Sequence, residues 1–120
     1  MESDREPCVL VVEDEFLVAL LVEEALIEAG FRVLGPAVSL DKAMELAGSD
    51  RVDAALLDIE LCDGNEVYPA ADILAEHDVP FAFISSQPHE FIEPRFIARP
   101  VLQKPFKDKE VQALAAKLVR

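Results

Sequence analysis

The chain has 120 residues, 52% of them hydrophobic, which is enough for one domain around one buried core. Its formal net charge is −13, and 11 basic side chains among 24 acidic ones cannot form the basic surface that nucleic-acid binding needs. No apolar run is long enough to span a membrane and no secretory leader is visible, so we expect a cytoplasmic protein without a membrane partner. Residues 1–7 are expected to form a disordered N-terminal tail, and residues 8–120 the folded domain.

The first half of the chain alternates short apolar runs with helical patterns. Residues 8–12 form a β-branched and aliphatic run that predicts a buried strand, and residues 32–37 predict a second, shorter one. Helices are predicted at residues 15–29, where Gly30 stops the helix, and at residues 39–48, where Gly48 ends it. The apolar residues expected to face the sheet from the first helix are Val18, Leu21, Val22, Ala25, Leu26 and Ala29.

The second half repeats this alternation. Its predicted elements are strands at 54–57, 80–84 and 101–102, and helices at 66–77 and from Asp108 onward. A short helix is also expected within residues 87–99, where Pro88 and Pro94 exclude a longer one. Strands alternating with helices predict a doubly wound (βα)5 fold, an α/β fold of the flavodoxin type with five parallel strands in the order 2-1-3-4-5.

Polar side chains follow the ends of four predicted strands, where ligands of such sheets bind. These residues are Glu13, Asp14, Asp58, Ser85 and Lys104. The acids after the first strand have two interpretations that can both hold: they can cap the following helix, or they can bind a hard divalent cation. A lysine and a hydroxyl beside a cation form a cradle for a phosphoryl group, which a carboxylate can accept as aspartyl phosphate.

With these residues the chain resembles receiver domains of response regulators, the CheY-like family, over nearly its whole length. The matching segments are VLVVEDE (9–15), LLDIELCDG (56–64), PFAFISS (80–86) and QKPF (103–106). The stretches DGNEVYPAADIL and RPVLQKPF are similar to those of small stand-alone receivers in α-proteobacteria.

The resemblance implies a role for each strand-end residue. It makes Asp58 the phosphoacceptor, Ser85 the switch hydroxyl and Lys104 the salt-bridge partner of the phosphoryl group. The implied ligands of Mg²⁺ are Glu13, Asp14, Asp58 and the backbone carbonyl of Glu60. The family also implies a cis peptide bond between Lys104 and Pro105.

Four positions depart from the usual pattern of the family, among them Ser86, which stands where Ala or Gly is usual. Serine replaces the commoner threonine at Ser85. Val101 stands where receivers commonly carry Tyr or Phe, and it lacks the ring that follows the switch hydroxyl inward. Cys62 replaces a frequent proline, and loop variation is the better interpretation because an acidic loop does not activate a thiol.

We therefore expect a receiver that is phosphorylated on Asp58 by a histidine kinase or a histidine phosphotransfer protein and signals by contact with an output protein. It would catalyse only its own phosphorylation and dephosphorylation. The alternatives are a Mg²⁺-dependent phosphatase, with Glu60 as the second acid, and a docking module that is not phosphorylated. A second apolar stripe on the first helix, Phe16, Leu17 and Leu20, is expected to dock the phosphodonor or to form a homodimer, so the chain is expected to be a monomer or a weak homodimer.

Overall fold

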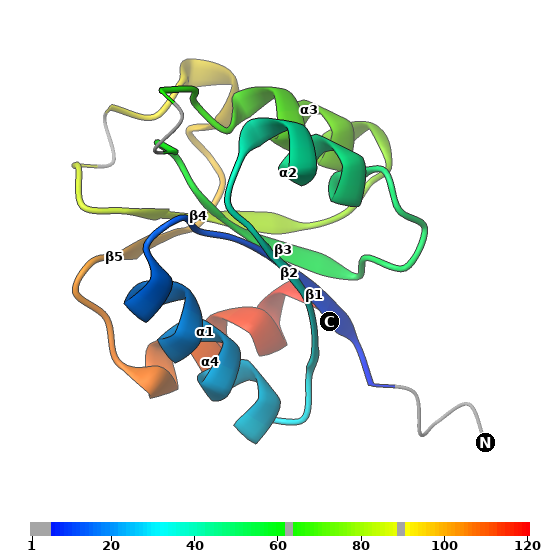
Figure 1. Ribbon diagram of the computed structural model, residues 1–120, viewed down its shortest axis with the longest axis vertical. Coiled ribbons are helices and arrows are strands. Elements are labelled where there is room, and N and C mark those ends of the chain that lie inside the picture. The colour runs from blue at the N-terminus through cyan, green and yellow to red at the C-terminus, as the bar shows by residue number, and fades with distance from the viewer. Residues whose placement is uncertain (1–5, 62–63, 89–90) are drawn as a thin grey trace.

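Five parallel strands form the centre of the fold, in the order β2-β1-β3-β4-β5 (Figure 1). This computed structural model describes residues 6–61, 64–88 and 91–120. The strands are β1 (Cys8–Val12), β2 (Arg32–Ala37), β3 (Ala54–Asp58), β4 (Phe81–Ser85) and β5 (Val101–Gln103). The observed order confirms the predicted doubly wound sheet. It places β1 and β3 side by side at the switch point, where the order in which successive strands are added reverses.

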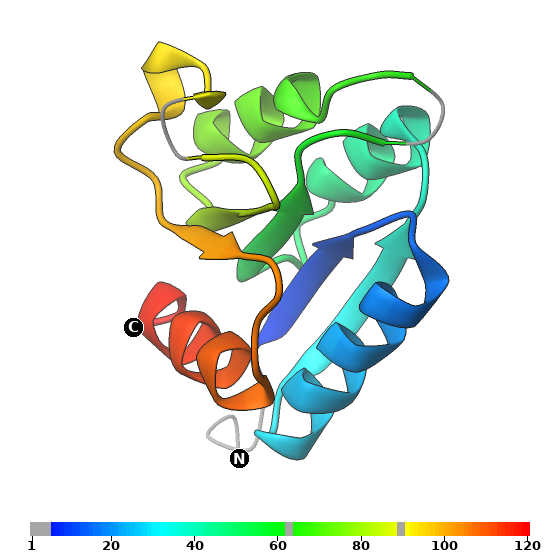
Figure 2. The ribbon, with the colours of Figure 1, turned by 90° about the vertical axis from the view of Figure 1, so that its left-hand side faces the viewer.

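Helices cover both faces of the sheet. They are α1 (Phe16–Glu28), α2 (Leu40–Ala47), α3 (Tyr68–Glu76) and α4 (Asp108–Leu118). Figures 1 and 2 show α1 and α4 on one face and α2 and α3 on the other. Within the described residues, no helix has the length and apolar character needed to cross a membrane.

The central strands are buried on both faces, which explains why they read as continuous apolar runs. Alternate residues of each strand point to opposite sides, so the sheet has two cores. In β4, Phe81 and Phe83 point toward α3, while Ala82 and Ile84 point toward α1 and α4. The sheet is therefore held by packing on both sides, and its strand ends are left to carry polar groups.

Between β4 and β5 the described residues contain no α-helix. Where a short helix is expected within residues 87–99, the described residues include the 3-10 turn η3 (Pro94–Phe96), because Pro88 and Pro94 cannot donate the bonds that a longer helix requires. Aromatic rings cover this part of the sheet instead: Phe96 lies 5.6 Å from Phe81 and 5.8 Å from Phe83 between ring centroids. Residues 6–61, 64–88 and 91–120 thus contain four α-helices and not five.

The buried face of α1 differs from the prediction. Leu21, expected to face the sheet, is 52% exposed, and Ala29 is exposed as well, whereas Ala19 is buried. Apolar residues surround most of this helix, so spacing alone defines two overlapping stripes. Contact with the sheet selects the stripe that contains Ala19, Val22 and Leu26.

The described N-terminal residues are tied to β2. The backbone N–H of Arg32 donates to the carbonyl of Pro7 at 2.9 Å, and the side chain of Arg32 donates to the carbonyl of Glu6 at 3.3 Å. The rest of the predicted tail, residues 1–5, lies outside the described residues. The peptide bond between Lys104 and Pro105 is cis, as the family resemblance implies.

Candidate functional site

Glu13 lies directly after β1 and is completely buried. Its backbone N–H donates to the carbonyl of Ala37 at the end of β2 at 3.0 Å, which fixes the position of the residue. Its Oε2 accepts a hydrogen bond from the backbone N–H of Glu15 at 3.2 Å. Its Oε1 is buried and accepts no hydrogen bond among the described residues, although the Nζ of Lys104 lies 3.5 Å from it. A buried carboxylate oxygen that lacks a hydrogen-bond donor can be satisfied by a cation.

Asp58 ends β3 and faces the acids that follow β1. Its side chain is nearly buried, because the whole of β3 is enclosed between the two helical layers. Oxygen atoms of Glu13, Asp14 and Asp58 all lie within 4.8 Å of one another. Three carboxylates at this separation repel one another, and they form an oxygen-rich ligand set that suits a hard divalent cation. The donor set and the unsatisfied oxygen of Glu13 therefore both fit Mg²⁺.

Lys104 follows the edge strand β5 and brings a positive charge to the same cluster. Its Nζ lies 3.5 Å from Oε1 of Glu13 and 3.9 Å from Oδ1 of Asp58. Its backbone N–H donates to the carbonyl of Ser85 at 2.9 Å, which ties the end of β5 to the end of β4. Nζ also lies 3.5 Å from Oε1 of Glu15, a pairing that the sequence did not predict.

Burial and charge change the acidity of these groups. Desolvation by burial and the neighbouring Glu13 raise the pKa of Asp58 to about 8, although Lys104 opposes the shift. Desolvation also raises the pKa of Glu13. Burial alone would lower the pKa of Lys104, but the carboxylates of Asp58, Glu13 and Glu15 raise it, so the ammonium keeps its charge. Without a metal ion, the carboxyl group of Asp58 is thus mostly protonated at neutral pH.

We expect the metal-free domain to lose stability as the pH rises from about 5 to about 8. The folded state binds a proton at Asp58 up to a pKa of about 8, whereas the unfolded chain releases it near the ordinary value of 3.8, so a higher pH favours unfolding. The loss should be on the order of a few kcal/mol. Urea denaturation in a chelator at the two pH values measures it. Asp58→Asn should remove most of this pH dependence, and a wild-type stability that increases with pH would contradict the expectation.

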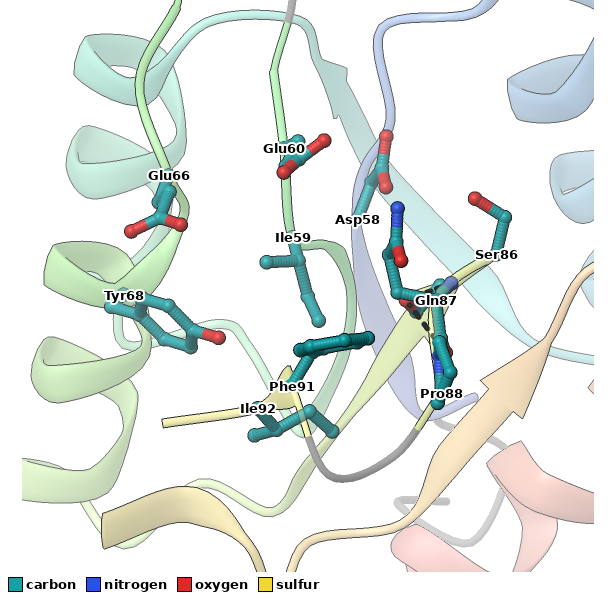
Figure 3. A pocket seen from close by; sticks show the side chains of 11 residues that line it. Asp58, Ile59, Glu60, Glu66, Tyr68, Ser86, Gln87, Pro88, Phe91 and Ile92 are labelled. Atoms are coloured by element: carbon teal, nitrogen blue, oxygen red, sulfur yellow. Dashed lines mark hydrogen bonds between the residues drawn. The ribbon is translucent and has the colours of Figure 1, made fainter. Parts of the chain in front are cut away.

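A small cavity lies beside Asp58, between α3 and the segment that follows β4 (Figure 3). It has a volume of about 70 Å³. Its lining residues are Asp58, Ile59, Glu60, Glu66, Tyr68, Ser85, Ser86, Gln87, Pro88, Phe91 and Ile92. The hydroxyl of Ser85 is buried here, accepts a hydrogen bond from the backbone N–H of Gln87 at 2.9 Å and donates to its carbonyl at 3.4 Å. Asp58, Ser85 and Glu60 thus share one pocket.

The structure brings together the five strand-end residues that the sequence singled out, around Asp58. It adds Tyr68, which lines the pocket from α3 and which the sequence did not single out, and it pairs Lys104 with Glu15, one of the three acids after β1, in a contact that was not predicted. No local sequence signal marks either role, because both depend on contacts between distant segments. Cys62 lies outside the described residues.

The stripe expected to dock a partner lies on the surface of α1. Phe16 is 76% exposed, Leu17 is 70% exposed and Leu20 is 36% exposed. A surface groove lies beside this helix. Its lining residues are Val18, Leu21, Ser86, Lys104, Pro105 and Phe106. Val18 and Leu21 of α1 thus line the groove beside Lys104, and the exposed stripe lies on the same helix.

The relatives of this chain are bacterial regulators. No protein-family model matches it. The Phyllosphere-induced regulator PhyR of Methylorubrum extorquens is 32% identical over 121 residues, which is 95% of this chain and 44% of PhyR. The chain thus spans less than half the length of that curated relative.

Solved structures resemble this chain over almost its full length. The solution structure of SdrG from Sphingomonas melonis Fr1 has 34% identity and a TM-score of 0.83, over 96% of this chain and 98% of SdrG. The receiver (REC) domain of the response regulator PhyR from Erythrobacter litoralis has 28% identity and a TM-score of 0.83, over 98% and 92% of the two chains. Since the sheet order, the acidic cluster and this likeness agree, the chain belongs to the receiver domains of response regulators, the family that serves two-component signalling.

Proposed function

We propose that this receiver domain accepts a phosphoryl group on Asp58 in a reaction that requires Mg²⁺. The donor is a histidine kinase or a histidine phosphotransfer protein, and the signal leaves through contact with an output protein in the cytoplasm. The observation that carries this proposal is the cluster of Glu13, Asp14 and Asp58, with oxygen atoms within 4.8 Å of one another and Lys104 beside them. The domain turns over only its own aspartyl phosphate.

In this reaction a carboxylate oxygen of Asp58 attacks the phosphorus atom of a phosphohistidine. The bond between phosphorus and the imidazole nitrogen breaks, an acyl phosphate forms, and the imidazole leaves and takes up a proton. Lys104 donates a charge-assisted hydrogen bond to the transferred group, and the hydroxyl of Ser85 exchanges its bond to Gln87 for one to a phosphoryl oxygen.

Glu13, Asp14, Asp58 and the backbone carbonyl of Glu60 would hold Mg²⁺ in this site. When bound, the cation would neutralise charge on the phosphoryl oxygens and favour the ionised form of Asp58. The second effect matters because a carboxyl with a pKa of about 8 is mostly protonated, and a poor nucleophile, at neutral pH. The raised pKa thus supplies a physical reason for dependence on a divalent cation.

Incubation with acetyl phosphate and Mg²⁺, followed by intact mass measurement, tests the proposal. The wild-type chain is expected to gain one phosphoryl group, and neither Asp58→Asn nor a sample with chelator should gain it. If the chain instead hydrolyses acetyl phosphate rapidly and no phosphoryl adduct forms on it, it behaves as a phosphatase and the proposal is contradicted. The absence of any reaction, which is the expectation for a docking module, would also contradict it.

We propose further that Phe16, Leu17 and Leu20 dock the phosphodonor. They are exposed on α1 and lie next to the groove at Lys104, so a helical partner seated there would face Asp58. A homodimer through the same stripe is the alternative.

Leu20→Glu should slow phosphoryl transfer from the partner severalfold or more, because it places a charge in an apolar contact. Labelling by acetyl phosphate, which needs no docking, should be unchanged. Ile27→Glu is the matched control: Ile27 is also exposed on α1, about 10 Å further along the helix axis. Equal loss with both donors would indicate a folding defect, and a change from dimer to monomer in light scattering would favour the homodimer.

A further inference from the structure

Tyr68 is the one tyrosine of the chain, and it lies at the edge of the pocket beside Asp58. It is the first residue of α3 and only 4% exposed. Its ring stacks on Phe96 at 5.8 Å and meets Phe83 edge-on at 5.9 Å between centroids. Figure 3 shows its hydroxyl pointing into the pocket. A polar group on α3 therefore faces the same space as the strand-end residues.

The hydroxyl of Tyr68 binds the segment that forms the opposite wall. It accepts a hydrogen bond from the backbone N–H of Glu93 at 3.2 Å. Glu93 directly follows Ile92, which lines the pocket and is 3% exposed. This partly buried bond thus connects α3 to the pocket wall.

An ion pair on the surface ties the same two segments. Arg95 donates from Nε to Oδ1 of Asp72 at 3.2 Å and from Nη2 to Oδ2 at 3.0 Å, and Asp72 lies one turn along α3 from Tyr68. About half of both side chains is exposed, so this pair contributes little. The bond from Glu93 to Tyr68, which is partly buried and ends on a hydroxyl that is only slightly exposed, is therefore the stronger candidate for holding the wall.

We propose that Tyr68 is a positioning residue of this pocket, whose hydroxyl holds the backbone at Glu93 and so keeps the adjacent wall residues Phe91 and Ile92 in place beside Asp58. The wall then limits the access of water to an acyl phosphate on Asp58, a role that rests on the proposed function. Burial raises the pKa of Tyr68, which keeps the hydroxyl protonated over the range in which the domain works.

Amide hydrogen exchange of the unphosphorylated protein tests the hydrogen bond. Tyr68→Phe keeps the ring and removes the hydroxyl, so the amides of residues 91–99 should exchange severalfold faster, and those of β3 at the wild-type rate. Ser49→Ala is the matched control, because the hydroxyl of Ser49 accepts the backbone N–H of Arg51, also at 3.2 Å, after α2. It should leave residues 91–99 unchanged.

The lifetime of the acyl phosphate tests the positioning role. After acetyl phosphate is removed, the phosphoryl group should be lost roughly threefold faster or more from Tyr68→Phe than from wild type, because water reaches it more easily. Ser49→Ala should decay at the wild-type rate. A merely structural residue would lower the melting temperature without shortening this lifetime in the folded variant.

The outcomes separate this inference from the proposed function. Unchanged exchange at residues 91–99 in Tyr68→Phe overturns the inference, whether or not the chain is labelled. Faster exchange with an unchanged lifetime also overturns it. If wild type gains no phosphoryl group, the proposed function fails, and the exchange experiment still decides whether the hydroxyl holds the wall. If Tyr68→Phe does not fold, exchange of the Glu93 amide in wild type decides: protection of this amide supports the hydrogen bond to Tyr68, and exchange as fast as at an exposed loop amide overturns the inference.

Discussion

Asp14→Asn is expected to abolish phosphorylation of Asp58 while the domain stays folded. Oxygen atoms of Glu13, Asp14 and Asp58 lie within 4.8 Å of one another, so the substitution removes one of three charges that would hold Mg²⁺. In the metal-free protein the same change relieves repulsion between like charges, and the free energy of unfolding should stay equal or increase. Intact mass after incubation with acetyl phosphate and Mg²⁺ measures the first effect, and urea denaturation in a chelator measures the second.

Asp78→Asn provides the matched control for this variant. Asp78 is exposed and precedes β4, so it lies at the opposite edge of the sheet from the site. Its φ of 57° is a conformation that asparagine tolerates, and the control makes the same chemical change without strain. This control should be labelled like wild type. Labelling of Asp14→Asn at the wild-type rate would mean that the metal site has been assigned to the wrong residues.

Lys104→Ala is expected to leave the domain folded and to remove the response to phosphorylation. In the resting structure the ammonium lies 3.5 Å from Glu13 and 3.9 Å from Asp58. After phosphorylation it would bind a group that is absent at rest, and only contacts that differ between two states can shift the equilibrium between them. The emission of Tyr68, the one tyrosine in a chain without tryptophan, is a direct readout of this change near the pocket.

The measurement compares wild type, Lys104→Ala and Lys109→Ala, each with Mg²⁺ and with or without acetyl phosphate. Lys109 is exposed on α4, and its removal should preserve the emission change. For Lys104→Ala, circular dichroism should match wild type while the emission change is lost. Unfolding of this variant would make Lys104 a structural residue, and a full emission change would show that the response does not depend on its charge.

Much of the fold can be read from the sequence because parallel strands enclosed by helices leave an unmistakable pattern. β1, β3 and β4 are buried on both faces, so each appears as a short apolar run, and the alternation with helices determines the sheet order. The same topology gathers the ends of the strands at one edge. Glu13, Asp58 and Lys104 could therefore be grouped before any contact was known.

The remaining features depend on contacts that no local pattern encodes. Apolar residues surround most of α1, and only the sheet decides that Ala19 is buried and Leu21 exposed. The 3-10 turn between β4 and β5 is stabilised by Phe96, which packs on rings from β4 and α3. Such packing joins residues that are far apart in the chain, so local periodicity carries no signal for it.

The sequence by itself determined the class of fold and the acidic strand ends, because these follow from local hydropathy and from the geometry of parallel sheets, and its resemblance to receiver domains implied that Asp58 is the phosphoacceptor. Only the tertiary structure decided what surrounds Asp58. The pairing of Glu15 with Lys104 spans 89 positions, and the bond from Glu93 to Tyr68 spans 25. Each needs two segments to meet with the right side chains facing each other, and that is set by the packing of the whole domain.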